Sequence, residues 1–129
     1  MNAESSPPPQ LHELEAEVME AIWDLGESSV REVMEALNPA APKPRAYTTY
    51  MTILARLHGK GLLDRRREGK TDYYREAYTR AEYADLRAQA EVAALVDAFG
   101  DVALGHFARQ MAELDPKRRR ALERLARER

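Results

Sequence analysis

The stretch from residue 46 to residue 78 constrains the fold of this chain more than any other. Apolar side chains recur there at the three- and four-residue spacing of one helix face, which predicts a helix over residues 48–58. The expected buried positions of this helix are Tyr50, Ile53, Leu54 and Leu57. Gly59 and Gly61 end the helix, and two short β-prone segments follow, separated by a turn at residues 68–70. The stretch therefore predicts a helix that leads into a β-hairpin.

The other face of the same helix is polar. Thr49, Thr52 and Arg56 are three and four residues apart, so they share that face. Short polar side chains on a helix can enter a DNA major groove, and basic side chains beside it can contact phosphates. We expect base contacts from Thr48, Thr49, Thr52 and Arg56. We expect phosphate contacts from Arg45, Tyr47, Arg65, Arg66, Arg67 and Lys70.

The distribution of charge supports this interpretation, although the whole chain has a net charge of only −2. Residues 1–44 contain two basic and nine acidic side chains, whereas residues 45–80 contain nine basic and four acidic ones. Residues 81–129 contain nine of each. A basic cluster alone is often a solvated surface, but here it coincides with the helix and the hairpin, as a phosphate-binding surface requires.

Two more helices are predicted before this stretch. Leu11, Leu14, Val18, Ile22 and Leu25 form an amphipathic period that Gly26 stops. A shorter helix follows Ser28 or Ser29, a suitable N-cap, and ends before a proline-rich loop over residues 38–45 that we expect to be non-helical. Three helices and a hairpin predict a mainly α fold with a small β-hairpin wing, a winged helix-turn-helix, over residues 11–78. The proline-rich residues 1–10 are expected to be disordered.

Residues 79–129 predict three further helices. The first begins with the Thr79–Glu82 capping box, Gly100 ends it, and Asp101 and Asp115 are expected to cap the next two. Their apolar stripes are narrow, and short helices need packing to be stable, so we expect this segment to form a homodimer. The expected dimerisation residues are Tyr83, Leu86, Ala90, Ala93, Leu104, Phe107, Met111, Leu122 and Leu125. The alternative is a monomer in which the tail folds back on residues 11–78.

The sequence gives no indication of an enzyme. It has no cysteine, no glycine-rich phosphate loop and no nucleophile elbow, and its three histidines, His12, His58 and His106, lie in separate predicted helices without metal-ligand spacing. We therefore expect no catalytic residues, no cofactor and no metal. The first residues do not form a signal peptide, and no apolar run reaches the length of a membrane span, so we expect a cytoplasmic protein without membrane insertion.

These segments together resemble the penicillinase-repressor family of winged-helix regulators, which includes β-lactamase, methicillin-resistance and copper-transport repressors. The resemblance covers about residues 11–127 and is carried by LHELEAEVMEAIWDLG, SSVREVMEAL, AYTTYMTILARLHGKGLL and TDYYREAY. It implies a homodimer that represses a stress- or antibiotic-response operon from a partly palindromic double-stranded DNA operator. Thr49, Thr52 and Arg56 match the operator-contacting positions, and the last three helices match the dimerisation domain.

The resemblance also implies how repression ends. In the antibiotic-resistance members a membrane receptor protease senses β-lactam, and the repressor is cut in its dimerisation domain at an Asn-Phe pair. His106 and Phe107 occupy the matching place here, without the asparagine. The copper-responsive members carry a cysteine-rich tail, which this chain lacks. Two alternatives to an operator-binding repressor are a winged helix used for protein contacts and a regulator with a small-molecule pocket between the tail helices.

Overall fold

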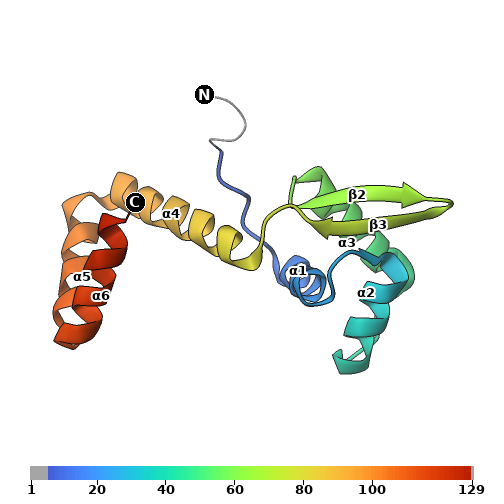
Figure 1. Ribbon diagram of the computed structural model, residues 1–129, viewed down its shortest axis with the longest axis horizontal. Coiled ribbons are helices and arrows are strands. Elements are labelled where there is room, and N and C mark those ends of the chain that lie inside the picture. Colours follow the sequence, from blue (N-terminus) through green and yellow to red (C-terminus); the bar gives the residue numbers. More distant parts are fainter. Residues whose placement is uncertain (1–5, 129) are drawn as a thin grey trace. The chain divides into compact units, whose positions relative to one another are not determined.

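The computed structural model describes residues 6–128, and the chain divides into two compact units, Met1–Ala88 and Gln89–Arg129. The first unit holds α1 (Glu13–Leu25), β1 (Ser28–Ser29), α2 (Val30–Leu37), the short 3-10 turn η2 (Asn38–Ala40), α3 (Tyr47–Gly59), β2 (Leu63–Glu68) and β3 (Thr71–Glu76) (Figure 1). Helix α4 (Arg80–Phe99) begins in the first unit and ends in the second, which also holds α5 (Asp101–Ala112) and α6 (Pro116–Arg127). The structure confirms the prediction of a mainly α fold with a small wing.

The helix ends follow local chemistry. Gly26 ends α1 in a backbone conformation with φ +86°, which favours glycine. Ser29 caps α2 as predicted: its hydroxyl accepts from the Glu32 amide at 3.2 Å, and the Glu32 carboxylate accepts from the Ser29 amide at 2.8 Å. The loop over residues 38–45 was predicted to lack helix, but it begins with η2, because proline is tolerated in the first turn of a helix.

The sheet has three strands rather than the two of the predicted hairpin. Its order is β1-β3-β2, and the two-residue β1 pairs Ser28 with Tyr74 and Ser29 with Tyr73. Strands β2 and β3 form the wing, with Glu68 opposite Thr71, so the connecting turn is Gly69 and Lys70. Gly69 has φ +64°, the left-handed conformation that a two-residue hairpin turn requires.

The core of the first unit lies between the three helices and the root of the wing. All four side chains predicted for the buried face of α3, namely Tyr50, Ile53, Leu54 and Leu57, are buried. Leu62 and Leu63, where the chain leaves α3 for the wing, and Tyr74 on β3 join the same cluster. The wing is therefore fixed to the helices at its root, while the rest of β2 is exposed.

The beginning of α4 belongs to the first unit. Tyr83 packs on Trp23 with ring centroids 5.7 Å apart and donates its hydroxyl hydrogen to the Pro9 carbonyl at 2.9 Å, and Arg87 donates to the Pro8 carbonyl at 3.0 Å. These contacts attach the start of α4, which follows the predicted boundary of 78/79, to the first unit. They also bear on the expected disorder of residues 1–10: Pro8 is buried, whereas residues 1–5 lie outside the described residues.

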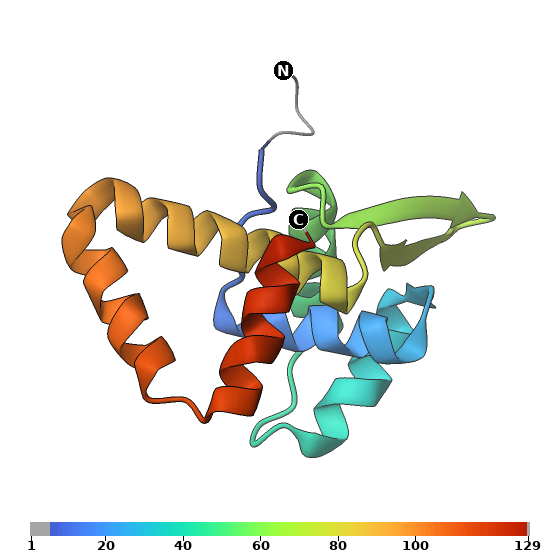
Figure 2. The ribbon, with the colours of Figure 1, turned by 60° about the vertical axis from the view of Figure 1, so that its left-hand side comes forward.

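Helices α5 and α6 have different N-caps. Asp115 caps α6 as predicted, because its carboxylate accepts from the Arg118 amide at 2.9 Å. Asp101 was expected to cap α5, but it is the first residue inside the helix, and Gly100 (φ +57°) holds the cap position without a side chain. Figure 2 shows α5 and α6 diverging from the turn that joins them. No described residue of α4, α5 or α6 is buried.

Glu15 is a buried carboxylate in the first unit, with an exposed fraction of 1%. It accepts from the His12 amide at 2.9 Å and pairs with the Lys60 ammonium at 2.7 Å, which joins α1 to the end of α3. Burial raises the pKa of Glu15, but the His12 hydrogen bond and Lys60 outweigh it and lower the pKa below the ordinary 4.5. This pair therefore stabilises the fold above about pH 4.5, and the stabilisation is lost as the pH falls through the lowered pKa.

We predict that Lys60→Met lowers the free energy of unfolding by about 1–3 kcal/mol at pH 7, because it leaves a buried carboxylate without its cation. The loss should shrink as the pH falls to 3, because protonation of Glu15 removes the unpaired buried charge. Urea unfolding at both pH values measures it, with Lys43→Met on the exposed loop as the control. An equal loss at both pH values would show that the charge of Lys60 is irrelevant.

Candidate nucleic-acid interface

Helix α3 presents a broad exposed face on the side opposite the core. Three of the predicted base-reading residues, Thr48, Thr52 and Arg56, are exposed, and Thr49 lies half-buried at the edge of that face. The Arg56 guanidinium has no hydrogen-bond or ion-pair partner among residues 6–128. Tyr47 and Met51 are also exposed, on the edge of α3 nearest the wing. The sequence analysis missed Met51, because an isolated methionine on a helix is usually a packing residue.

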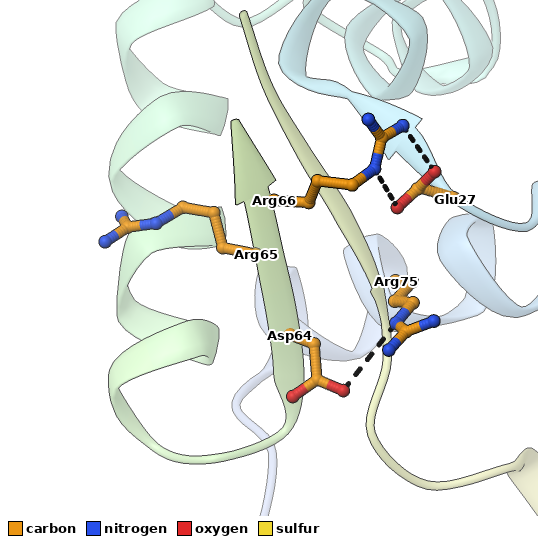
Figure 3. Close-up of a pocket in the computed structure, with 5 residues that line it drawn as sticks. All are labelled: Glu27, Asp64, Arg65, Arg66 and Arg75. Atoms are coloured by element: carbon orange, nitrogen blue, oxygen red, sulfur yellow. Dashed lines mark hydrogen bonds and ion pairs between the residues drawn. The ribbon is translucent and has the colours of Figure 1, made fainter. Parts of the chain in front are cut away.

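The alternation of side chains along β2 separates the three wing arginines. Arg65 and Arg67 lie on the same face of the sheet as the buried Leu63, and Arg66 lies on the other face, opposite Tyr73. Figure 3 shows Arg65 pointing away from Arg66 and from Glu27. The Arg65 guanidinium has no hydrogen-bond or close ion-pair partner in the described part of the chain, whereas Arg67 pairs with Asp72 at 3.0 Å. The three adjacent arginines are therefore not equivalent.

A cleft of about 460 Å³ lies between the N-terminal ends of α2 and α3 and the wing. Tyr47 and Met51 line it from α3, and Arg67 and Lys70 line it from the wing. Arg31, in the first turn of α2, also lines it and lies over the Tyr47 ring at 5.9 Å. The only carboxylate in this lining is Asp72, which Arg67 already pairs, so the cleft keeps an excess of positive charge suited to a phosphate group.

Arg31 is a candidate phosphate contact that the sequence analysis missed. The 30 residues before Arg31 contain no Lys or Arg, and the same helix carries Glu32 and Glu35. The local charge was therefore acidic and gave no indication of a phosphate contact at Arg31. The available signal was its place in the first turn of the helix before α3, which is the part of a helix-turn-helix that runs near the DNA backbone.

Arg45, a predicted phosphate contact, is engaged with the protein. Its guanidinium lies 3.3 Å from the Glu17 carboxylate and 3.5 Å from the Tyr50 hydroxyl, and these two groups raise the pKa of Arg45. Its backbone amide donates to the side-chain oxygen of Asn38 at 3.0 Å, and its backbone carbonyl accepts from the side-chain nitrogen of Asn38 at 2.9 Å. Arg45 thus closes the loop that leads into α3.

Residues 6–128 contain no cluster of three or more His, Cys, Asp or Glu side chains that could hold a metal ion. In the same range, no helix combines the length and the apolar character needed to cross a membrane.

An exposed polar helix beside a basic cleft and a two-stranded wing defines a winged-helix DNA-binding protein, of the kind that regulates transcription. Comparison with known proteins agrees: the model of the penicillinase repressor family matches residues 11–128. The chain belongs to this family and is a transcriptional repressor rather than an enzyme.

Individual relatives resemble the chain in sequence and in structure. The transcriptional regulator BlaI of Mycobacterium tuberculosis (strain CDC 1551 / Oshkosh) is 36% identical over 118 residues, which cover 88% of this chain and 84% of the relative. The solution structure of the DNA-binding domain of the repressor BlaI superposes with a TM-score of 0.51 and 30% identity, covering 59% of this chain and 90% of the other. A structure of the Bacillus licheniformis BlaI monomeric form in complex with the blaP half-operator has a TM-score of 0.49 and 30% identity, with the same coverage.

Proposed function

We propose that this repressor acts as a homodimer on a partly palindromic operator, with α3 of each protomer in the major groove of one half-site. The observation that carries the proposal is the exposed polar face of α3 next to the basic cleft and the wing. A dimer with one recognition helix in each protomer requires two half-sites separated by about one turn of the DNA helix, or by a multiple of it. Because the operator is chromosomal or plasmid DNA, we also propose that the protein acts in the cytoplasm.

We assign base reading to Thr48, Thr49, Thr52 and Arg56. Arginine can bond guanine through two donors, and threonine methyl groups can contact the thymine methyl. Met51 adds an exposed apolar side chain to the same face, and we assign it to contact with thymine methyl groups or sugars. The half-buried Thr49 is the member of this set with the least freedom to reach a base.

We assign phosphate binding to the cleft and to the adjacent face of the wing. The contributing side chains are Arg31, Tyr47, Arg65, Arg67 and Lys70. For Arg45 we propose a supporting role, since its ion pair with Glu17 and its backbone bonds to Asn38 hold the start of α3.

Selection of genomic fragments with the purified protein would identify the operator, and DNA binding to it tests the role of α3. We predict that Arg56→Ala weakens operator binding by about 1–3 kcal/mol, with a much smaller effect on scrambled DNA, because it removes a base contact. Fluorescence anisotropy on both DNAs measures the difference. Arg75→Ala is the matched control, because Arg75 is exposed on the wing face that carries Arg66. Unchanged operator affinity for Arg56→Ala would show that Arg56 makes no base contact and would count against α3 as the reader.

The homodimer is supported by the apolar side chains that the second unit leaves uncovered. Val92, Leu95 and Phe99 recur at helical spacing on α4 and are exposed, as are Val102 and Leu104 on α5 and Leu125 on α6. So many exposed large apolar side chains on three short helices that bury no residue favour a partner surface that covers them. Of the nine residues predicted for the interface, Tyr83 does not fit, because it packs on Trp23 within the first unit. Leu86, Ala90, Ala93, Leu104, Phe107, Met111, Leu122 and Leu125 remain our proposed set, extended by the α4 stripe.

We predict that Leu95→Glu converts a dimer into a monomer, because it places a charge in the proposed apolar interface. Analytical ultracentrifugation at tens of micromolar measures the oligomeric state. Ala36→Glu, at an exposed position of α2 in the first unit and outside the proposed interface, is the control and should remain dimeric. The monomeric variant should also lose about 100-fold or more in affinity for the full operator, because two linked readers bind far more tightly than one. A monomeric wild-type protein would refute the proposal.

For release from DNA we propose cleavage at His106-Phe107, following the family resemblance and an indirect link to a membrane β-lactam receptor protease. The bond lies in the interior of α5, so the helix must open locally before a protease can bind it. We predict that exposure of the native host to β-lactam yields an N-terminal fragment ending near His106, visible on western blots of the N-terminally tagged protein. Derepression with the full-length protein intact would refute this route.

A further inference from the structure

Arg66 is held by more interactions than any other side chain of the wing. Its Nε and Nη2 atoms donate to the two oxygens of Glu27 at 3.1 and 2.8 Å, in a bidentate pair (Figure 3). Its Nη1 atom donates to Glu68 at 2.5 Å, and the guanidinium lies over the Tyr73 ring at 4.9 Å. Each of the three guanidinium nitrogens therefore has a carboxylate partner.

The cluster of Arg66, Glu27, Glu68 and Tyr73 connects strands of the sheet that are not direct neighbours. In the order β1-β3-β2, β2 is an outer strand, and beyond the buried Leu63 its side chains are exposed. Glu27 lies directly before β1, on the far side of β3. Arg66 thus reaches across Tyr73 of the central strand and ties the outer strand to the turn between α1 and β1.

The charges argue against a phosphate at Arg66. One guanidinium between two carboxylates leaves a local net charge of −1, which repels a DNA backbone. The hydrogen bond from Arg66 also lowers the pKa of Glu27, so the pair stays ionised at neutral pH. Arg65 differs: it lies on the other face of the strand, and among the described residues its guanidinium has no direct hydrogen bond or close ion pair with a carboxylate, although Asp72 lies near enough for Arg65 to lower the pKa of that carboxyl.

We propose that Glu27 and Arg66 are positioning residues that brace the wing, and that Arg66 does not contact DNA. The brace holds β2 so that Arg65, Arg67 and Lys70 face the phosphates together. The part that concerns DNA depends on the function proposed above, whereas the brace itself is a property of the free protein.

Four variants of the full-length protein test this proposal: Glu27→Gln, Arg66→Ala, the double charge reversal Glu27→Arg with Arg66→Glu, and Arg65→Ala as the matched arginine control. In the absence of DNA, hydrogen exchange of the wing amides over residues 64–75 reports the brace. We expect exchange to accelerate by about two- to fivefold in Glu27→Gln and Arg66→Ala, and to return close to wild type in the double reversal. Arg65→Ala should leave exchange unchanged. Unchanged exchange in all variants would refute the brace, whether or not the protein binds an operator.

DNA binding over a range of salt concentrations tests the second half of the proposal. Arg65→Ala should reduce the slope of log affinity against log salt by about 0.9, the value for one phosphate contact. Glu27→Gln and Arg66→Ala should both weaken binding by about two- to fivefold with the slope unchanged, and the double reversal should restore the affinity. If Arg66 binds phosphate instead, Glu27→Gln should strengthen DNA binding, and Arg66→Ala should reduce the slope of log affinity against log salt. The double charge reversal should then fail to restore the affinity. That pattern would overturn the proposal.

Discussion

The orientation of α3 depends on one buried tyrosine more than on any other residue. Tyr50 is fully buried, and its hydroxyl donates at 2.7 Å to the Asn38 side chain, which also accepts from the backbone amide of Arg45. A buried hydroxyl needs a partner, and this partner lies at the end of α2, so the interaction fixes both the rotation of α3 and the path of the loop before it. Since Tyr50 faces inward, Thr48, Thr52 and Arg56 must face outward.

The wing is attached in two different ways, which explains why its arginines differ. Its root is held by burial of Leu62, Leu63 and Tyr74, an interaction that salt does not screen. Beyond Leu63 its outer strand is held by pairing with β3, by the contact of Arg66 with the Tyr73 ring and by exposed ion pairs, and salt screens those ion pairs. A wing with a fixed root and an adjustable outer strand can adapt to the DNA backbone without disturbing the core.

Much of this fold could be predicted because its signals are local. The period of Tyr50, Ile53, Leu54 and Leu57 gave the buried face of α3, and the Ser29 and Thr79 capping boxes gave two helix starts. Strand β1 could not be predicted, because two serines show no alternation, and only pairing with β3 makes them a strand. Ionic partners were equally hidden: Arg66 meets Glu27 39 residues away, so three consecutive arginines looked alike. An apolar stripe likewise does not reveal what covers it, which is why Tyr83 was expected in the dimer but packs on Trp23.

The contrast between the two units suggests how binding and release are connected. The first unit has a core of its own, whereas the described helices of the second unit bury no residue. Helices of this length are marginal without packing, so in our proposal α5 and α6 gain most of their stability from the partner protomer. The free energy of opening α5 near Phe107 then rises with dimerisation, and a monomer exposes that bond more often than a dimer. Any process that separates the protomers would therefore both weaken operator binding and expose the proposed cleavage position, and each effect would reinforce the other.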